Sequence, residues 1–216
     1  MVLNTFSLAE RTGIITGAGQ GLGKAFALAF AEAGADVVAA ELSAESGAQT
    51  VAEIETLGRL SRFIETDVTR PESVDAMMSE VVDAFGRVGF MMNNAVIVHR
   101  DAAESLSDDD WLKVIDVNLN SLYYCFRAVG LVMIEQRAGS IINIASVSGS
   151  IVNTPQPQAS YNASKAAVIQ LTRSLASEWA PHHVRINSIS PGYMKTAMTQ
   201  SFLDDPAYGG KWIPAI

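Results

Sequence analysis

The chain has 216 residues, 49% of them hydrophobic, which is enough for one ordered domain with a sizeable core. Its 15 basic and 23 acidic side chains give a net charge of −8. This balance disfavours a nucleic-acid partner and an anionic membrane surface, because both attract basic faces. The composition therefore excludes a disordered chain and predicts a single domain over residues 1–216.

Cysteine and histidine content restricts the chemistry further. Cys125 is the only cysteine in the sequence, so neither an internal disulfide nor a cysteine-based metal site is expected. The three histidines, His99, His182 and His183, lack metal-ligand spacing, so no metal site is predicted. The N-terminal residues do not resemble a signal peptide, and no apolar run reaches the roughly 18 residues of a membrane span. We therefore expect a cytoplasmic protein without a membrane segment.

The first predicted unit is a strand, a glycine-rich loop and a helix. Thr12–Thr16 is apolar and leads into Gly17–Gly23, whose sequence is GAGQGLG. The following helix should end at Gly34 and pack on the core through Leu22, Ala25, Phe26, Ala29, Phe30 and Ala33. Glycines let the backbone approach a pyrophosphate, and a helix N-terminus offers it free N–H groups. A glycine cluster alone is often only a turn, but this context favours dinucleotide binding.

The second predicted strand, Asp36–Ala40, ends at an acidic residue, Glu41. An acidic side chain about 20 residues beyond the glycine loop can accept hydrogen bonds from a ribose 2′-hydroxyl, and it would repel a 2′-phosphate. The glycine loop also lacks a basic residue, since Gln20 stands inside it. Both features favour NAD over NADP. The alternative interpretation is that Glu41 is a solvated strand end.

Strands and helices continue to alternate along the chain. The other expected strands are Leu60–Thr66, Val88–Met92, Ser140–Ala145 and Val184–Ile189. The other expected helices are Ser43–Leu57, Pro71 to Phe85, a long helix that begins at Ser107, and Tyr161–Trp179. The apolar face of the long helix carries Trp111, Val114, Ile115, Leu122 and Phe126. The inward residues of the last helix are Ala166, Ile169, Leu175 and Ala176. This alternation predicts an α/β fold, a doubly wound parallel sheet of the Rossmann type with helices on both faces.

Polar or glycine-containing segments follow the ends of the predicted strands. They are Gly17–Gly23, Glu41, Asp67, Asn94, Ser146 and Pro191-Gly192. Ligands of such sheets bind at the carboxyl ends of the strands, so these segments should converge on one site. Asn118 is a polar residue inside the apolar pattern of the long helix, where a buried amide needs partners. It is either structural or links a water to a catalytic group.

Tyr161 and Lys165 stand four residues apart in YNASK, which places them on one face of a helix. A free tyrosine has a pKa of about 10, and a positive charge about 5 Å away would lower this pKa by about two units. The pair could therefore form a general acid/base near neutral pH. Ser146, shortly upstream, could hydrogen-bond a substrate oxygen beside the phenol. The alternative is that the pair belongs to an ordinary amphipathic helix surface.

Together these motifs resemble the short-chain dehydrogenase/reductase family from about Leu8 to Thr199. The matching stretches are TGAGQGLG at Thr16–Gly23, Asp67-Val68, Asn93–Ala95, Asn118, Ser146, Tyr161–Lys165 and Pro191–Thr196. The resemblance implies that Tyr161 is the acid/base and that Ser146 binds the reacting oxygen. It also implies that Lys165 lowers the tyrosine pKa and holds the nicotinamide ribose, and that Asn118 supports a proton relay through water. Ser148 competes with Ser146, but the spacing from the strand favours Ser146.

The resemblance also implies a set of binding residues. The cofactor contacts would be Gly17, Gln20, Gly21, Leu22, Gly23, Glu41, Asp67, Val68, Asn94, Ala95, Tyr161, Lys165, Pro191, Gly192, Met194 and Thr196. The loop before Tyr161 is similar to that of members acting on polyols and sugars, such as arabinitol, galactitol and mannitol dehydrogenases and sorbose reductase. The substrate contacts would then be Ser146, Ser148, Asn153 and Tyr161. By the same analogy we expect a homo-oligomer, either a dimer or a tetramer.

Two features depart from the family pattern. Val96 stands where glycine is usual, and it could crowd the cofactor or strain the backbone if its φ is positive. The chain ends at Ile216, whereas related proteins continue with further helices and a strand. Without these elements the sixth strand would be a bare edge. We expect that a C-terminal part is missing; the alternatives are that another chain covers the edge or that the protein is compromised.

The favoured hypothesis is an NAD-dependent oxidoreductase that interconverts a secondary alcohol and a ketone, with a polyol or sugar as the substrate and Tyr161 as the acid/base. A second enzyme hypothesis is an oxoacyl-carrier or other carbonyl reductase. A third is a non-catalytic dinucleotide-binding protein, which Val96 and the short C-terminus favour. The presence of Tyr161 with Lys165 argues against the third, because a pure binder does not need this pair.

Overall fold

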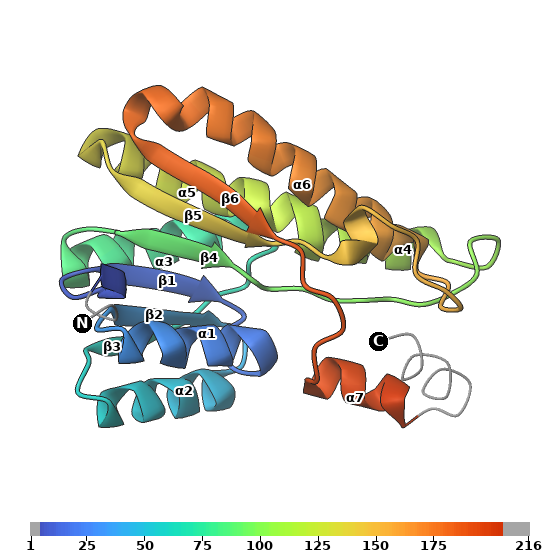
Figure 1. The fold of residues 1–216 in the computed structure, drawn as a ribbon, viewed down its shortest axis with the longest axis horizontal. Coiled ribbons are helices and arrows are strands. Elements are labelled where there is room, and N and C mark those ends of the chain that lie inside the picture. Colours follow the sequence, from blue (N-terminus) through green and yellow to red (C-terminus); the bar gives the residue numbers. More distant parts are fainter. Residues whose placement is uncertain (1–4, 205–216) are drawn as a thin grey trace.

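The computed structural model describes residues 5–204 and contains a six-stranded sheet (Figure 1). Its strand order is β3-β2-β1-β4-β5-β6, and every neighbouring pair is parallel. The strands are β1 (Thr12–Thr16), β2 (Asp36–Glu41), β3 (Ser61–Glu65), β4 (Phe90–Asn93), β5 (Gly139–Ile144) and β6 (Val184–Ile189). The predicted bounds of β1 and β6 are correct, and the other strands shift by one or two residues at their ends.

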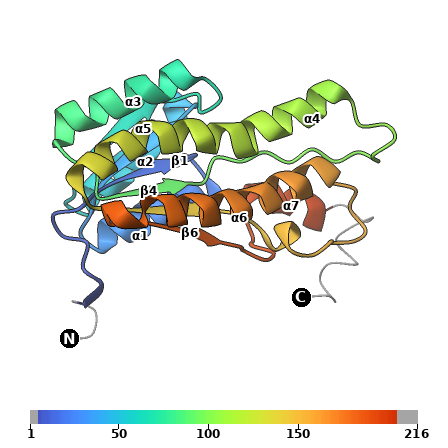
Figure 2. The same cartoon turned by 90° about the horizontal axis from the view of Figure 1, so that it is seen from above.

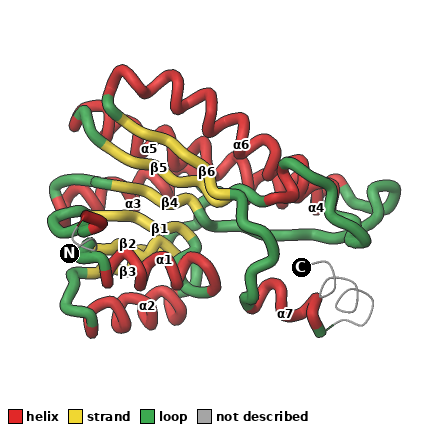
Figure 3. The backbone as a smooth tube through the Cα atoms, viewed as in Figure 1, coloured by secondary structure: helices red, strands yellow, loops and turns green. Residues whose placement is uncertain are grey.

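Helices cover both faces of this sheet, which confirms the predicted doubly wound α/β fold (Figure 2). The covering helices are α1 (Gly21–Glu32), α2 (Ala44–Thr56), α3 (Pro71–Phe85), α5 (Ser121–Gln136) and α6 (Ala159–Trp179). Two further helices, α4 (Asp108–Ile115) and α7 (Ala197–Leu203), lie beyond the carboxyl ends of the strands. Successive strand side chains point to opposite faces. Accordingly, Ile14 of β1 packs in the apolar cluster shared with α3, α5 and α6, and Ile15 packs in the cluster shared with α1 and α2. The loops that follow the strands gather at one edge of the sheet (Figure 3).

The long helix predicted from Ser107 is interrupted at its centre. A π-helical segment, Asp116–Asn120, separates α4 from α5 and contains the fully buried Asn118. Such segments often occur at functional sites. The prediction for Trp111 is wrong, because its side chain is 37% exposed on α4, which projects past the end of the sheet (Figure 2).

The helical stretch Asp108–Gln136 is long and apolar enough to cross a membrane by length and composition, with a mean hydropathy of 1.2 in its most apolar part. Half of that part is buried inside the protein. Phe126 and Met133 of α5, for example, belong to the core between helices and sheet. We therefore interpret this stretch as a core helix.

The face of α1 that packs on the sheet agrees with the predicted face only in part. Gly23, Ala27 and Ala31 are buried, whereas Ala25 and Ala29 are exposed. Small side chains at the contact let the helix approach the sheet backbone closely, and the two phenylalanines of α1 lie only partly buried beside it. Phe26 and Phe30 pack against the core as predicted, so the predicted face is correct for these two rings and wrong for Ala25 and Ala29.

Two further predictions concern α6 and β6. Ala166, expected to face inward, is exposed, and Lys165 and Val168 occupy the buried face of α6 instead. β6 has β5 as its one strand neighbour within residues 5–204, as expected for an edge strand. Its Arg185 and Ile189 side chains are exposed.

Candidate active site

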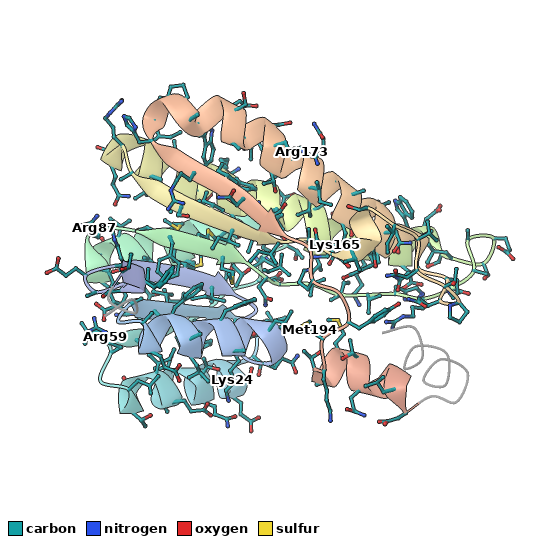
Figure 4. The ribbon with its side chains drawn as sticks, in the orientation of Figure 1. Lys24, Arg59, Arg87, Lys165, Arg173 and Met194 are labelled. Carbon is teal, nitrogen blue, oxygen red and sulfur yellow. The ribbon has the colours of Figure 1, made fainter. Side chains whose placement is uncertain are left out.

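A cavity of about 600 Å³ lies at the carboxyl ends of the strands. This volume is in the range of small-molecule and cofactor sites. Lys165 on α6 and Met194 in the segment after β6 both line it, whereas Arg59 and Arg87 lie toward the opposite end of the sheet (Figure 4). The predicted site residues that line the cavity are Gly17, Gln20, Gly21, Leu22, Glu41, Asp67, Val68, Asn94, Ala95, Ser146, Tyr161, Lys165, Pro191, Gly192, Met194 and Thr196. Gly23, Asn118, Ser148 and Asn153 are not among its lining residues.

The glycine loop is shaped by positions that accept only glycine without strain. Gly17 and Gly21 have φ values of +64° and +54°, a region that side chains with a Cβ rarely adopt. A Cβ on Gly23 would lie 2.0 Å from the carbonyl oxygen of Gly17 and 2.5 Å from Nδ2 of Asn94. Asn94 Nδ2 also donates to the carbonyl oxygens of Thr16 and Gly17, each at 3.1 Å. The loop is therefore held close to both β4 and α1.

The start of α1 is suited to an anion. Its N-cap residue, Gln20, makes no side-chain capping bond, and the first turn contains no acidic residue. The first N–H groups of a helix lack intrahelical partners and carry the positive end of the helix dipole. Because this helix end lines the cavity, the residues present fit the pyrophosphate of a dinucleotide.

Glu41 is fixed by backbone donors, so it is not the solvated strand end of the alternative interpretation. Its Oε2 accepts a hydrogen bond from the Gly19 N–H at 2.8 Å, and its Oε1 accepts one from the Leu42 N–H at 2.9 Å. A Cβ added to Gly19 would lie 2.9 Å from the same Oε2. The Glu41 carboxylate thus lies against the glycine loop at the cavity wall. Its negative charge disfavours the binding of another anion, such as a phosphate, beside it.

Ser146, Tyr161 and Lys165 meet at the opposite side of the cavity. The Ser146 side chain lies close enough to Tyr161 to lower the pKa of the phenol. Lys165 Nζ lies 5.7 Å from the centre of the Tyr161 ring and donates to the carbonyl oxygen of Ile144 at 2.7 Å. The arrangement brings a phenol, a hydroxyl and an amine together at the cavity. The hydrogen bond to Ile144, the last residue of β5, holds the amine in place.

The expectation that Lys165 lowers the pKa of Tyr161 is wrong for the protein without a bound cofactor. Burial raises the pKa of Tyr161, and the hydrogen bond from Ser146 and the charge of Arg100 oppose this rise only in part. Burial also lowers the pKa of Lys165 to about 7. Lys165 is 2% exposed, so desolvation of its ammonium outweighs the attraction that an i,i+4 spacing suggests.

Asn118 uses its side chain for structural bonds. Its Oδ1 accepts from the Ile97 N–H at 2.9 Å, and its Nδ2 donates to the Ile97 carbonyl oxygen at 2.9 Å and to Ser164 Oγ at 3.1 Å. Both amide hydrogens are therefore occupied. These bonds agree with the structural role that was one of the two predicted alternatives. The other alternative, a part in a proton relay through water, stays a prediction.

Val96 lines the cavity but does not strain the backbone. Positive φ values at non-glycine residues between residues 5 and 204 occur at Glu10, Arg137 and His183. The possible backbone strain at Val96 is therefore absent.

Two residues near Ser146, Tyr161 and Lys165 were not predicted from the sequence. Arg100, in the loop after β4, lies close enough for its charge to act on Tyr161, but no motif marks it. Gln158 is 6% exposed and donates to Ser148 Oγ at 3.3 Å and to Asn162 Oδ1 at 3.0 Å. Two glutamines, Gln156 and Gln158, shortly before YNASK are the one signal that could have indicated buried amide bonds there.

Comparison with known proteins agrees with this geometry. The family model for short chain dehydrogenase matches residues 11–207. The chain belongs to the short-chain dehydrogenase family. The predicted family is thereby confirmed, and the motifs quoted above all fall within the matched residues.

Three relatives illustrate the similarity. Galactitol 2-dehydrogenase of Rhizobium johnstonii is 47% identical over 133 residues, which cover 61% of this chain and 52% of that protein. 2-Dehydro-3-deoxy-D-gluconate 5-dehydrogenase of Dickeya dadantii is 36% identical over 206 residues, covering 95% of this chain and 80% of that protein. A short-chain dehydrogenase/reductase structure from Mycobacterium marinum has a TM-score of 0.96 at 36% identity and covers 100% of this chain and 84% of its own. The match thus spans about half the length of the first of these relatives.

Two solved structures of the family differ in their cofactor. An NAD⁺-bound xylitol dehydrogenase has a TM-score of 0.89 at 31% identity, covering 96% of this chain and 84% of that one. A gluconate 5-dehydrogenase from Burkholderia cenocepacia, in complex with NADP and tartrate, has a TM-score of 0.90 at 32% identity, covering 96% of this chain and 81% of that one. The short-chain dehydrogenase fold therefore accommodates either nicotinamide cofactor.

Proposed function

We propose that this short-chain dehydrogenase is an NAD-dependent oxidoreductase that interconverts a secondary alcohol and a ketone, with a polyol or sugar as its substrate. The observation that carries the proposal is the single cavity whose walls hold the glycine loop and Glu41 on one side and Ser146, Tyr161 and Lys165 on the other. A hydroxyl group placed beside Tyr161 would also lie within the volume that a dinucleotide enters.

The protein residues would divide the work of alcohol oxidation. Ser146 holds the substrate oxygen beside Tyr161, which takes the hydroxyl proton as general base and returns it in the reverse direction. Lys165, whose amine lies 5.7 Å from the centre of the Tyr161 ring, would hold the nicotinamide ribose, and its protonated form would stabilise the phenolate. A bound nicotinamide would take up the hydride leaving the substrate carbon, or supply it for ketone reduction. The net products of oxidation are a ketone, a reduced nicotinamide and a proton.

The preference for NAD is proposed from the charge at the adenosine end of the cavity. The carboxylate of Glu41 is fixed 2.8 Å from the Gly19 amide, so it cannot swing away from a 2′-phosphate without losing backbone bonds. A ribose 2′-hydroxyl can instead donate to the remaining lone pairs of the carboxylate. Gln20 offers no positive charge to compensate a phosphate.

A second substrate class, the sugar acids, is favoured by one observation. The charge of Arg100 reaches Tyr161, so the reacting oxygen lies in a positive potential. A carboxylate on the substrate would be attracted to that potential, whereas a neutral polyol would not. The Dickeya dadantii relative is, by its name, a dehydrogenase of such an acid.

A substrate panel tests the proposed function. Polyols, sugars, sugar acids and an acyl-carrier ketone are offered with NAD or NADP, and the absorbance of the reduced nicotinamide is followed. We expect turnover with NAD on polyols or sugar acids. Turnover confined to the acyl-carrier ketone would support the oxoacyl reductase, and NADH binding without any turnover would support the non-catalytic protein.

We also propose that the chain forms a homo-oligomer, a dimer or a tetramer. The exposed Tyr123 and Leu131 of α5 and the single neighbour of β6 in the described residues support this proposal. Light scattering in solution measures the molar mass directly, and a monomer would contradict it. A cytoplasmic location without membrane attachment stays a prediction.

A further inference from the structure

A group of polar side chains lies beside the catalytic residues without lining the cavity. Ser148 stands in the short helical turn Val147–Gly149 after β5, and its Oγ accepts hydrogen bonds from Asn153 Nδ2 at 2.7 Å and Gln158 Nε2 at 3.3 Å. Gln158 Nε2 also donates to Asn162 Oδ1 at 3.0 Å. Ser148 and Gln158 are each 6% exposed, so these bonds form largely out of water, where they are stronger.

The bonds join two segments that each carry a reacting group. Ser146 precedes the short helical turn, and its Oγ accepts from the backbone N–H of Ser148 at 3.1 Å. Asn162 directly follows Tyr161 in the first turn of α6, and Gln158 is the N-cap residue of this helix. Gln158 therefore links the segment that holds Ser146 to the helix end that holds Tyr161.

Backbone packing between the same two segments is close. A Cβ on Gly149 would lie 2.7 Å from the carbonyl carbon of Lys165. A shift of the turn by a few tenths of an ångström would therefore either collide with α6 or open the contact. The relative position of Ser146 and Tyr161 depends on the bonds that hold the turn in place.

The count of donors and acceptors indicates which residue controls the turn. A serine hydroxyl has two lone pairs and one proton, and both lone pairs of Ser148 are used by the amides of Asn153 and Gln158. Gln158 in turn uses both Nε2 hydrogens, one on each segment. Removing this amide would leave a buried lone pair on Ser148 and a partly buried one on Asn162 without their donor.

We propose that Gln158 is a positioning residue for the oxidoreductase reaction: through Ser148 it fixes the distance and angle between the Ser146 hydroxyl and the Tyr161 phenol. In this role Ser148 acts through Ser146 instead of touching the substrate. The inference rests on the proposed function, since it assumes that Ser146 and Tyr161 act together on one substrate oxygen.

The test is a double-mutant cycle with Gln158→Ala, Ser148→Ala and the double variant. We expect Gln158→Ala to lower kcat by about ten- to hundredfold with little change in KM, because misplacement of reacting groups acts on the chemical step. In the Ser148→Ala background, Gln158→Ala should lower kcat by less than about threefold. The affinity for NADH, measured by fluorescence, should be unchanged in all variants.

The pH profile of kcat separates positioning from a general loss of structure. The hydrogen bond from Ser146 lowers the pKa of Tyr161, so a misplaced Ser146 should move the Tyr161 limb of the profile to higher pH in Gln158→Ala. Gln158→Leu has a side chain of similar size with neither donor nor charge, and it should show the same upward movement even if its thermal stability matches the wild type.

Gln156 supplies the matched control. It is also a buried glutamine of this loop, 5% exposed, but its Nε2 donates to Tyr193 Oη at 3.2 Å. Gln156→Ala should lower the melting temperature to a similar extent, and its effect on kcat should multiply with that of Ser148→Ala instead of vanishing. Multiplicative effects of Gln158→Ala and Ser148→Ala, or an unmoved pH profile, would overturn the inference. A wild-type protein without turnover on any substrate would instead refute the proposed function.

Discussion

The two sides of the cavity are held in different ways. On the cofactor side, the contacts that shape the glycine loop run to backbone atoms, such as Glu41 Oε2 to the Gly19 amide and Asn94 Nδ2 to the Gly17 carbonyl. On the catalytic side, Lys165 is buried on a strand-end carbonyl, and side chains such as Gln158 and Ser148 bond to one another. The glycine motif marks the cofactor side in the sequence, whereas no motif marks the side-chain bond between Gln158 and Ser148, although the two residues are only 10 positions apart.

This difference has a chemical consequence. The cofactor side offers fixed N–H groups and a fixed carboxylate, whose charges need no adjustment before a dinucleotide binds. The catalytic side holds two ionisable groups whose charged forms are both disfavoured by burial, since the pKa of Tyr161 is raised and that of Lys165 is lowered. A positively charged nicotinamide placed above Tyr161 would stabilise its phenolate, so cofactor binding on one side should prepare the acid/base on the other.

The largest expected effect removes the phenol. Tyr161→Phe should lower kcat/KM by about 10²- to 10⁴-fold, because the reaction loses its proton acceptor while the ring keeps its packing. NADH affinity, followed by fluorescence titration, should change little. If the variant retained wild-type turnover, Tyr161 would not be the acid/base, and the catalytic side would lie elsewhere.

The next largest effect is expected from a substitution in the glycine loop of the cofactor side. Gly23→Ala should destabilise the protein by about 3 kcal/mol and abolish NADH binding, because the new Cβ would meet the Gly17 carbonyl oxygen at 2.0 Å. Gly58→Ala is the control, since a Cβ there meets no atom within 4 Å and only its φ of +74° resists the change. The control should cost about 1 kcal/mol and keep NADH binding. Equal losses in both variants would mean that the close approach at Gly23 is not required.

A smaller effect concerns the buried amine. The pKa of Lys165 is about 7 in the folded protein, against about 10.4 for an unfolded chain. Between these values the unfolded state binds more protons, so the unfolding free energy rises with pH. From pH 7 to pH 9 the wild type should gain about 2 kcal/mol relative to Lys165→Met in denaturant titrations. A constant difference between the two proteins would show that Lys165 is charged when folded.

The smallest effect sharpens the cofactor preference. Glu41→Ala should reduce the ratio of kcat/KM for NAD over NADP by about tenfold, because a charge-assisted bond to ribose and a repulsion of the 2′-phosphate are both lost. The rate with the preferred cofactor at saturation should fall less than the ratio. An unchanged ratio would place the determinant of cofactor choice outside Glu41.

The difference between the two sides also explains which features could be predicted from the sequence. Strands such as Val184–Ile189 and the glycine loop with positive φ at Gly17 follow from local patterns, and the family match confirms the resemblance built on them. The packing face of α1 could not be predicted, because Ala27 and Ala31 touch the sheet only once the whole layer is assembled.

The chemistry of the catalytic side shows the same limit. The i,i+4 spacing correctly placed Tyr161 and Lys165 on one wall, but it gave the wrong direction for the tyrosine pKa. That direction depends on burial, which needs α6 packed against β5 and the loop after β4. The positions of Arg100 and Gln158 depend on the same packing, which cannot be predicted from the spacing of residues in the sequence.

Titration of the Tyr161 phenolate tests the central claim most directly. Its ultraviolet absorbance is followed against pH in the wild type minus Tyr161→Phe, first in the free protein and then with saturating NAD⁺. The account predicts that the pKa of Tyr161 lies above its ordinary value in the free protein and falls when NAD⁺ binds. A tyrosine that titrates normally in both states would contradict it.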